Sequence, residues 1–207
     1  QQITDALAVA LDPDSQGEVA ETGTESAEAY DLFLQGRFFW NKRTPQDLDV
    51  AVGLFRRAID ADSTFAAAYA GIADARAVPT GWGEDPASAL DTAEVYARRA
   101  IGIDPTLAQA HAALGLTLTM RDLDFEQAEA SFRRAIELDP QYATGRQWYA
   151  ELLSATERHE LAVSEALRSV ELDPTMIMRW NSARTLYHAG QYERAIAQTE
   201  RLMADDR

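Results

Sequence analysis

Small and apolar residues recur along this chain in one order: an alanine, then phenylalanine or alanine four residues later, then alanine or serine three residues after that. Four complete copies of the pattern begin at Ala51, Ala93, Ala128 and Ala162, and a fifth begins at Ala195. Successive copies start 42, 35, 34 and 33 residues apart. A spacing near 34 residues is typical of stacked helical hairpins, which bind other proteins far more often than they catalyse reactions. The pattern therefore predicts an all-α solenoid with a binding function, and it leaves the partner unnamed.

Apolar residues at helical spacing predict five hairpins between residue 26 and the end of the chain. Asp-Pro pairs at 104–105, 139–140 and 173–174 separate consecutive hairpins. Because a proline disfavours the helical conformation of the residue before it, we expect helices to end at these aspartates. The paired helices are predicted at 26–41 with 46–61, 65–78 with 87–103, 107–121 with 124–138, 142–156 with 158–172, and 176–189 with 191–204.

Two segments differ in composition from the hairpins. Residues 1–12 carry apolar side chains at helical spacing, and we interpret them as a helix at the end of a preceding domain. Residues 13–25 are rich in acidic residues, Gly, Ser and Thr, which favours an extended linker to the solenoid at 26–207. Trp82 lies between two glycines in a long connection, and we expect its ring to fold back onto the second hairpin.

The charge and residue usage of the chain exclude several classes of function. The net charge is −15, whereas nucleic acids and anionic membranes are bound through basic surfaces. There are no cysteines, so disulfides, thiolate metal sites and a cysteine nucleophile are excluded. No apolar run approaches the roughly 20 residues that a membrane-spanning helix needs. Nothing near residue 1 resembles a basic secretion leader.

Motifs with a catalytic or metal-binding mechanism are missing from the sequence. His111, His159 and His188 fall in three different hairpins, and a lone helical histidine is more often packed or solvated than a ligand. The chain contains no HExxH, no Gly-rich phosphate loop and no GxSxG elbow. We therefore expect no cofactor, no metal and no enzymatic activity in this part of the protein.

The repeated residues resemble the tetratricopeptide repeat (TPR) family, most closely in the third copy. The matching residues there are His111, Leu114, Gly115, Leu118, Phe125, Ala128, Phe132, Ala135 and Pro140. The resemblance covers about 26–207 and implies a right-handed superhelical solenoid of about five hairpins. The chain departs from the family at Ser63 and Arg207, where proline is usual, and at Asp74, where an aromatic residue is usual.

A narrower resemblance concerns residues 28–60 and 65–75, which contain the sequence GRFFWNKRT. They are similar to the C-terminal TPR segment of bacterial signalling proteins that carry a cyclase, a winged-helix transcription regulator or a Ser/Thr kinase. Residues 1–11 are similar to the last helix of a TolB-amino-terminal-like domain that often lies between the two parts. This resemblance implies a scaffold or sensory segment for signal transduction. It favours the cytoplasm, with the periplasmic side of a membrane-anchored regulator as the alternative.

The TPR resemblance also implies that the first helix of each hairpin lines a concave groove where a peptide or partner domain binds. In the first hairpin, Arg37 or Trp40 could face inward in place of the residues chosen, and Trp40 could equally belong to the core. The predicted groove residues are Asp31, Gln35, Phe38, Ile72, Arg76, Leu116, Met120, Gln147, Glu151, Trp180, Arg184, Tyr187 and His188. Aromatic residues and arginines in this set are the usual anchors of protein interfaces.

The chemistry of the partner can be narrowed further. TPR arrays that bind acidic chaperone tails resemble one another in a clamp of Lys and Asn, whereas the matching positions here include Asp31, Ile72, Leu116 and Glu151. A basic or apolar protein segment fits the net charge of −15 better than an acidic one.

The alternative function is self-association. An uncapped end of a repeat stack exposes apolar surface, and Ile196, Leu202 and Met203 lie in the last predicted helix. A homo-oligomer formed through this end would bring together copies of a fused cyclase, kinase or transcription-regulator domain.

Overall fold

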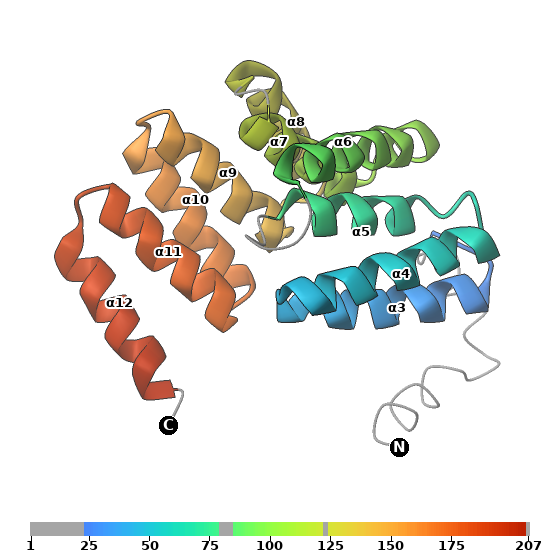
Figure 1. Ribbon diagram of the computed structural model, residues 1–207. Helices are drawn as coiled ribbons and strands as arrows, with labels where there is room; N and C mark the ends of the chain where they lie inside the picture. The colour runs from blue at the N-terminus through green and yellow to red at the C-terminus, as the bar shows by residue number, and fades with distance from the viewer. Residues whose placement is uncertain (1–22, 79–84, 122–123, 206–207) are drawn as a thin grey trace.

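The computed structural model describes residues 23–78, 85–121 and 124–205, and the regular structure in these ranges is entirely helical. The helices form the five predicted hairpins (Figure 1). They are α3 (Ala27–Lys42), α4 (Pro45–Ala61), α5 (Ala66–Ala77), α6 (Pro86–Ile103), α7 (Ala108–Arg121), α8 (Phe125–Leu138), α9 (Ala143–Ala155), α10 (His159–Leu172), α11 (Met176–His188) and α12 (Tyr192–Asp205). The predictions for residues 1–12, for most of the linker at 13–25 and for Trp82 fall outside the described residues.

The hairpins stack side by side in chain order and form an arch (Figure 1). Each first helix contacts the second helix of the preceding hairpin, as α5 contacts α4 and α11 contacts α10. The first helices also contact one another in the order α3, α5, α7, α9 and α11, so they form a continuous row. The result is the predicted superhelical solenoid, with its hydrophobic core running along the seam between hairpins.

Close approach between helices depends on glycines that face aromatic rings. Phe55 of α4 is fully buried between α3 and α5. A Cβ atom added at Gly36 of α3 would lie 2.5 Å from the Phe55 ring, and one added at Gly71 of α5 would lie 2.8 Å from it. The same arrangement recurs in the third hairpin, where a Cβ at Gly115 would lie 3.0 Å from Phe132. Glycine at these positions lets a large ring fill the space between two helix axes.

The turns between hairpins are closed by aspartate side chains. In the Asp-Pro turn after α8, the Asp139 carboxylate accepts a hydrogen bond of 2.8 Å from the backbone N–H of Gln141. The turn after α4 has no proline, yet Asp62 accepts an equivalent bond of 2.8 Å from Thr64 N–H. Asp62 and Asp139 both have extended backbone angles. The aspartate is therefore the feature that these turns share, and proline is an addition to it.

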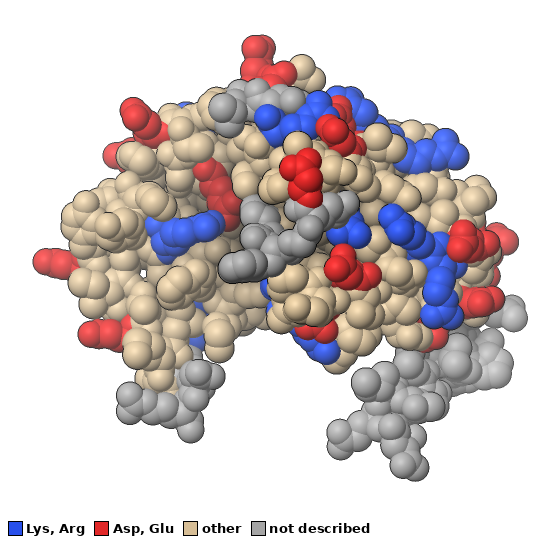
Figure 2. All heavy atoms as spheres, viewed as in Figure 1, with Lys and Arg blue, Asp and Glu red and all other residues tan. Residues whose placement is uncertain are grey.

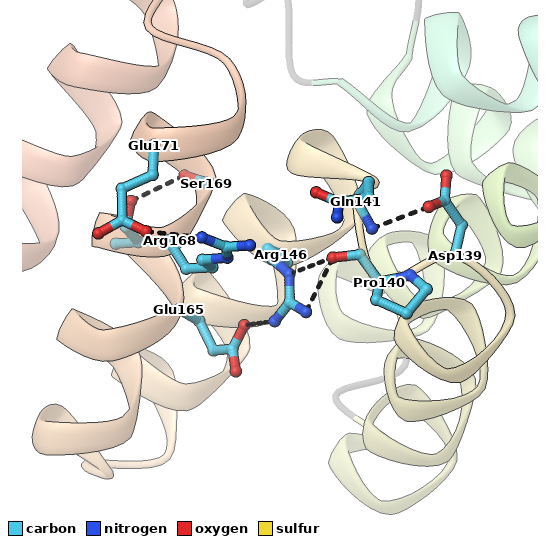
Figure 3. A network of polar contacts seen from close by, with 9 residues as sticks. Asp139, Pro140, Gln141, Arg146, Glu165, Arg168, Ser169 and Glu171 are labelled. Carbon is cyan, nitrogen blue, oxygen red and sulfur yellow. Dashed lines mark hydrogen bonds and ion pairs between the residues drawn. The ribbon is translucent and has the colours of Figure 1, made fainter.

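One position near the start of three first helices ties the helix to the turn before it. Tyr69, His111 and Arg146 each hydrogen-bond through the side chain to the carbonyl six residues earlier. In Figure 3, Arg146 donates from Nε and Nη2 to the Pro140 carbonyl at 3.1 and 2.9 Å, and from Nη1 to Glu165 of α10 at 2.6 Å. Three different side chains thus make the same kind of contact. His111 has a structural partner in the Pro105 carbonyl.

Candidate functional site

The row of first helices carries ion pairs between neighbouring hairpins. At the N-terminal end, Arg37 of α3 pairs with Asp74 of α5 at 3.3 Å. At the C-terminal end, Arg184 of α11 pairs with Glu151 of α9. These pairs show which face of each of these first helices is turned towards the neighbouring first helix.

Arg37 and Asp74 belong to a buried polar cluster in the N-terminal part of the stack. Asp74 is completely buried and also accepts a hydrogen bond of 2.6 Å from Gln109 of α7. The guanidinium groups of Arg37 and Arg43 lie against the ring of Trp40, with Cζ 4.1 and 3.6 Å from its centroid. Trp40 is itself buried, which places it in the core. The cluster therefore links the first three hairpins through polar contacts.

Burial dominates the titration of this cluster. It raises the pKa of the Asp74 carboxyl to about 6, and the charges of Arg37 and Arg43 together with the Gln109 hydrogen bond oppose the shift only in part. Burial also lowers the pKa of Arg43 to about 10, although Asp74 acts in the opposite direction. It raises the pKa of Tyr142, at the start of the fourth hairpin. The cluster therefore contains a carboxyl group that titrates near neutrality inside the protein.

Three of the predicted groove residues cannot meet a partner, which corrects the prediction for them. Ile72 and Leu116 are buried in the hydrophobic core, and Gln147 is buried beside Glu151, to which it donates a hydrogen bond of 2.6 Å. Helical spacing places them on first helices, but neighbouring first helices pack closely enough to cover them.

In the first two hairpins, the residues that pair across neighbouring first helices are Arg37, which the sequence left open as an alternative, and Asp74. Arg37 and Asp74, which pair across α3 and α5, are the residues of the inner row. Asp31 and Gln35 lie on another face of α3, where Gln35 donates to Asp31 at 2.7 Å. Arg76 pairs at 3.1 Å with Asp49 of α4, the second helix of the first hairpin.

Two further predicted residues are exposed but lie apart from the other exposed aromatic residues. Phe38 is half exposed and packs edge-on against Phe39, with Lys42 4.7 Å from its ring centroid. Met120, near the end of α7, is also exposed. They are accessible to a partner, but each comes from a different hairpin.

The fifth hairpin brings together most of the exposed residues of the predicted set. Trp180, Arg184 and Tyr187 line one hollow of about 550 Å³ between α11 and α12. The side chains of Trp180 and Tyr187 are 58% and 60% exposed. His188 is exposed beside this hollow, and its ring packs against Tyr187 with 5.7 Å between centroids.

The other half of this hollow comes from α12, which the predicted groove does not include. Tyr192 and Ile196 are both exposed and line the hollow, and the Tyr192 ring lies 5.4 Å from that of Tyr187. Ala183 and Ala195 lie at its base and are buried. The sequence does contain a signal for this surface, namely the apolar residues of the last predicted helix. From the sequence alone, these residues indicate a site of self-association. We call the hollow and its rim the terminal surface.

Charge on the molecule is mixed in sign. On the face shown in Figure 2, acidic and basic side chains are interspersed over the helices. Among residues 23–78, 85–121 and 124–205 no group of three or more His, Asp or Glu side chains is arranged to hold a metal ion. In the same ranges no helix is long and apolar enough to cross a membrane.

Five stacked two-helix units with a continuous inner row of first helices define an α-helical repeat solenoid. Residues 108–142, which contain the third hairpin, match the family model of the tetratricopeptide repeat. None of the curated proteins compared with the chain matches it in sequence.

Several solved structures share the fold. TTC0263, a thermophilic TPR protein of Thermus thermophilus, superposes with a TM-score of 0.69 at 15% identity, over 85% of this chain and 90% of that one. A crystal structure of MamA gives 0.51 at 17% identity, over 80% of this chain and 92% of its own. The 41-end segment of MamA from Desulfovibrio magneticus gives 0.52 at 11% identity, over 87% and 96%. The architecture is therefore that of a TPR solenoid, and such proteins are generally scaffolds for protein–protein interaction.

Proposed function

We propose that this chain is a non-catalytic scaffold that binds a peptide or a partner domain through its fifth hairpin. The observation that carries the proposal is the terminal surface, where exposed aromatic and aliphatic side chains surround a hollow of about 550 Å³. Monomeric proteins rarely leave contiguous apolar surface exposed unless it binds something. Exposed aromatic residues next to arginine are the usual anchors of such interfaces.

The partner we propose is a protein segment of apolar or basic character. Arg184 is already engaged with Glu151, so it is less available for an acidic group of the partner. The net charge of −15 would repel an acidic segment and attract a basic one. The same charge argues against nucleic acid and against anionic membranes as partners.

The biological setting we propose comes from the resemblance of residues 28–60 and 65–75 to bacterial signalling proteins. In that setting the solenoid is the sensory or scaffold part, and a cyclase, kinase or transcription regulator attached to it is the output domain. Self-association is a second candidate, because Ile196 and Met203 of α12 are both exposed at the end of the stack. A light-scattering mass that stays that of the monomer across concentrations would eliminate this candidate.

The test is selection of binding peptides from a random displayed library on the immobilised chain. Enriched peptides are synthesised and titrated by calorimetry against the native protein and against Trp180→Ala and Tyr187→Ala. Both residues are more than half exposed, so the variants should fold normally, which circular dichroism would verify. We expect each substitution to weaken binding by about tenfold or more. The matched control is Phe38→Ala, which removes an exposed aromatic ring from the opposite end of the stack.

The proposal fails if no peptide is enriched, or if the enriched peptides bind native protein and both fifth-hairpin variants equally. Loss of binding in Phe38→Ala with retention in the other two variants would move the site to the first hairpin.

A further inference from the structure

The terminal surface occupies a place in the stack that is covered in every earlier hairpin. Helix α5 contacts both α3 and α4, α7 contacts both α5 and α6, and α9 contacts both α7 and α8. Helix α11 covers the fourth hairpin in the same way, through contacts with α9 and α10. Among the described helices, none lies against α11 and α12 in the corresponding position. The hollow is therefore the continuation of an interface that the molecule repeats four times.

The exposed side chains of the fifth hairpin differ from those elsewhere on the molecule. Of the twelve large hydrophobic side chains exposed in the described parts of the chain, half lie on α11 and α12. They are Met176, Trp180, Tyr187, Tyr192, Ile196 and Met203. In an amphipathic helix of a stack, such residues belong to the face that the next element covers. Their concentration on one hairpin indicates a surface made for contact with another structural element.

The repeated interface also shows what shape of element fits. Where α5 covers the first hairpin, it presents Gly71 to the ring of Phe55 of α4. The residues of α5 around Gly71 are mainly alanines, and Ala70 and Ala73 are fully buried. A helix with small residues on its contact face approaches its neighbours closely, which buries the large side chains of the hairpin beneath it.

We propose that the occupant of the terminal surface is an amphipathic α-helix of a partner protein, with alanine or glycine at the centre of its apolar face. This inference rests on the proposed binding function and specifies the kind of partner. The helix docks as the first helix of a further hairpin would. It bears a Lys or Arg at its edge, because the acidic side chain of Glu200 lines the hollow and is exposed.

A peptide with the sequence of one of the protein's own helices can test this inference. Helix α7 covers the second hairpin in the equivalent position, and its Ala110 is fully buried in one cluster with Ala70 and Ala100 of that hairpin. A fluorescently labelled synthetic peptide of residues 105–121 is titrated against the complete chain, and its anisotropy is measured. The matched peptide carries Ala110→Trp, which places a bulky ring where close approach to the covered hairpin is needed. We expect saturable binding of the first peptide and roughly tenfold or greater weakening for the second.

Protein variants locate the binding site. Ile196→Glu introduces a charge on the exposed rim of the hollow and should weaken binding of the 105–121 peptide by about tenfold or more. Val95→Glu makes the same change at an exposed apolar position of α6, away from the terminal surface, and should leave binding unchanged. Both side chains are exposed, and circular dichroism with thermal unfolding confirms that each variant is folded.

Three results would overturn the inference. If library-selected peptides bind through Trp180 while the 105–121 peptide does not bind, the proposed function stands and the helical partner is wrong. If the Ala110→Trp peptide binds as well as its parent, close helix packing is not the mode of recognition. If the chain dimerises with rising concentration, Ile196→Glu abolishes the dimer and the peptide does not compete, the occupant is a second copy.

Discussion

The carboxylate of Asp74 on α5 accepts from the guanidinium of Arg37 on α3 at 3.3 Å, in a position where Asp74 has no exposed surface at all. Its neighbours are a second arginine, Arg43, and Gln109 of α7. Taking a carboxylate out of water costs several kcal/mol, and one nearby charge offsets that cost only in part. Asp74 therefore contacts the first and third hairpins through Arg37 and Gln109, while burial makes its ionised form the less favourable one in the folded protein.

Asp74 should make the protein more stable as the pH falls from about 6 to about 4. Its pKa is about 6 in the folded protein, against an ordinary value of 3.8, so the folded state binds a proton that the unfolded state lacks. A shift of this size corresponds to roughly 3 kcal/mol at most in the free energy of unfolding. In Asp74→Asn this contribution should vanish. Urea unfolding at pH 4 to 7 measures it as the difference in the free energy of unfolding between the native protein and the variant, which should narrow as the pH falls.

If the difference in the free energy of unfolding between the two proteins stays constant from pH 4 to pH 7, this prediction is wrong. A constant difference would mean that the Asp74 carboxyl has the same pKa in the folded and unfolded states. Because the comparison uses the difference between two proteins, titration of the other carboxyl groups cancels.

Glu129 of α8 should act in the opposite direction. Hydrogen bonds from Arg158 at 2.8 Å and from the Tyr149 hydroxyl at 3.0 Å hold the pKa of its carboxyl at about 2, below the ordinary 4.5. Its contribution to stability is therefore present above about pH 4.5 and lost as the pH falls towards 2. Glu129→Gln should lower the free energy of unfolding by about 1 kcal/mol at pH 7 and flatten the loss of stability in acid.

The control for Glu129 is Glu137→Gln on the same helix. Glu137 pairs with Arg134 at 3.3 Å, but its side chain is largely exposed, so the change should stay within about 0.5 kcal/mol. Equal effects of the two substitutions in chemical denaturation at pH 7 would show that the network around Glu129 adds nothing beyond a surface ion pair.

The hairpins could be predicted from sequence because their signals are local. Alanine and aromatic residues recur at a fixed period, and each helix end lies within a few residues of the predicted one. Proline is the signal that predicts the Asp-Pro turns, yet the turn at Asp62 forms with serine in its place. In all four turns the aspartate accepts a hydrogen bond from the backbone N–H two residues later, at Asp62, Asp104, Asp139 and Asp173.

The residues of the inner row could not be predicted in the first two hairpins, because contacts between hairpins identify them and the local sequence does not. Phe38, Phe39 and Trp40 are consecutive, so they point to different faces of α3, and composition does not show which ring is buried. The partner of Arg37 lies 37 residues away in another hairpin. In the fifth hairpin the signal is local, because Trp180, Arg184 and Tyr187 recur at helical spacing on one face of α11 and line the same hollow.

The aspartate of a turn should contribute more to stability than the proline after it. In Asp139→Ala the hydrogen bond from Gln141 N–H is lost, and we expect a decrease of about 1 kcal/mol in the free energy of unfolding. Pro140→Ala keeps that bond and also keeps the carbonyl that Arg146 contacts, so its effect should be below about 1 kcal/mol and arise from the unfolded chain. Thermal unfolding of both variants compares them directly. A larger loss of stability in Pro140→Ala than in Asp139→Ala would contradict this prediction.

Gly36 should be among the least replaceable small residues in the stack. A Cβ at this position would lie 2.5 Å from the ring of Phe55, which is fully buried and has no free space to move into. Gly36→Ala should therefore lower the free energy of unfolding by about 1–3 kcal/mol, despite the higher helix propensity of alanine. Gly53→Ala on α4 is the matched control, because a Cβ there meets nothing within 4 Å, and it should raise stability by roughly 0.5–1 kcal/mol. Adding Phe55→Leu to Gly36→Ala should recover part of the loss, since the smaller side chain makes room for the methyl group. Chemical denaturation of the native protein, Gly36→Ala, Gly53→Ala, Phe55→Leu and the double variant tests this coupling. A stabilising Gly36→Ala would show that α3 and α4 lie further apart than their glycine contact implies.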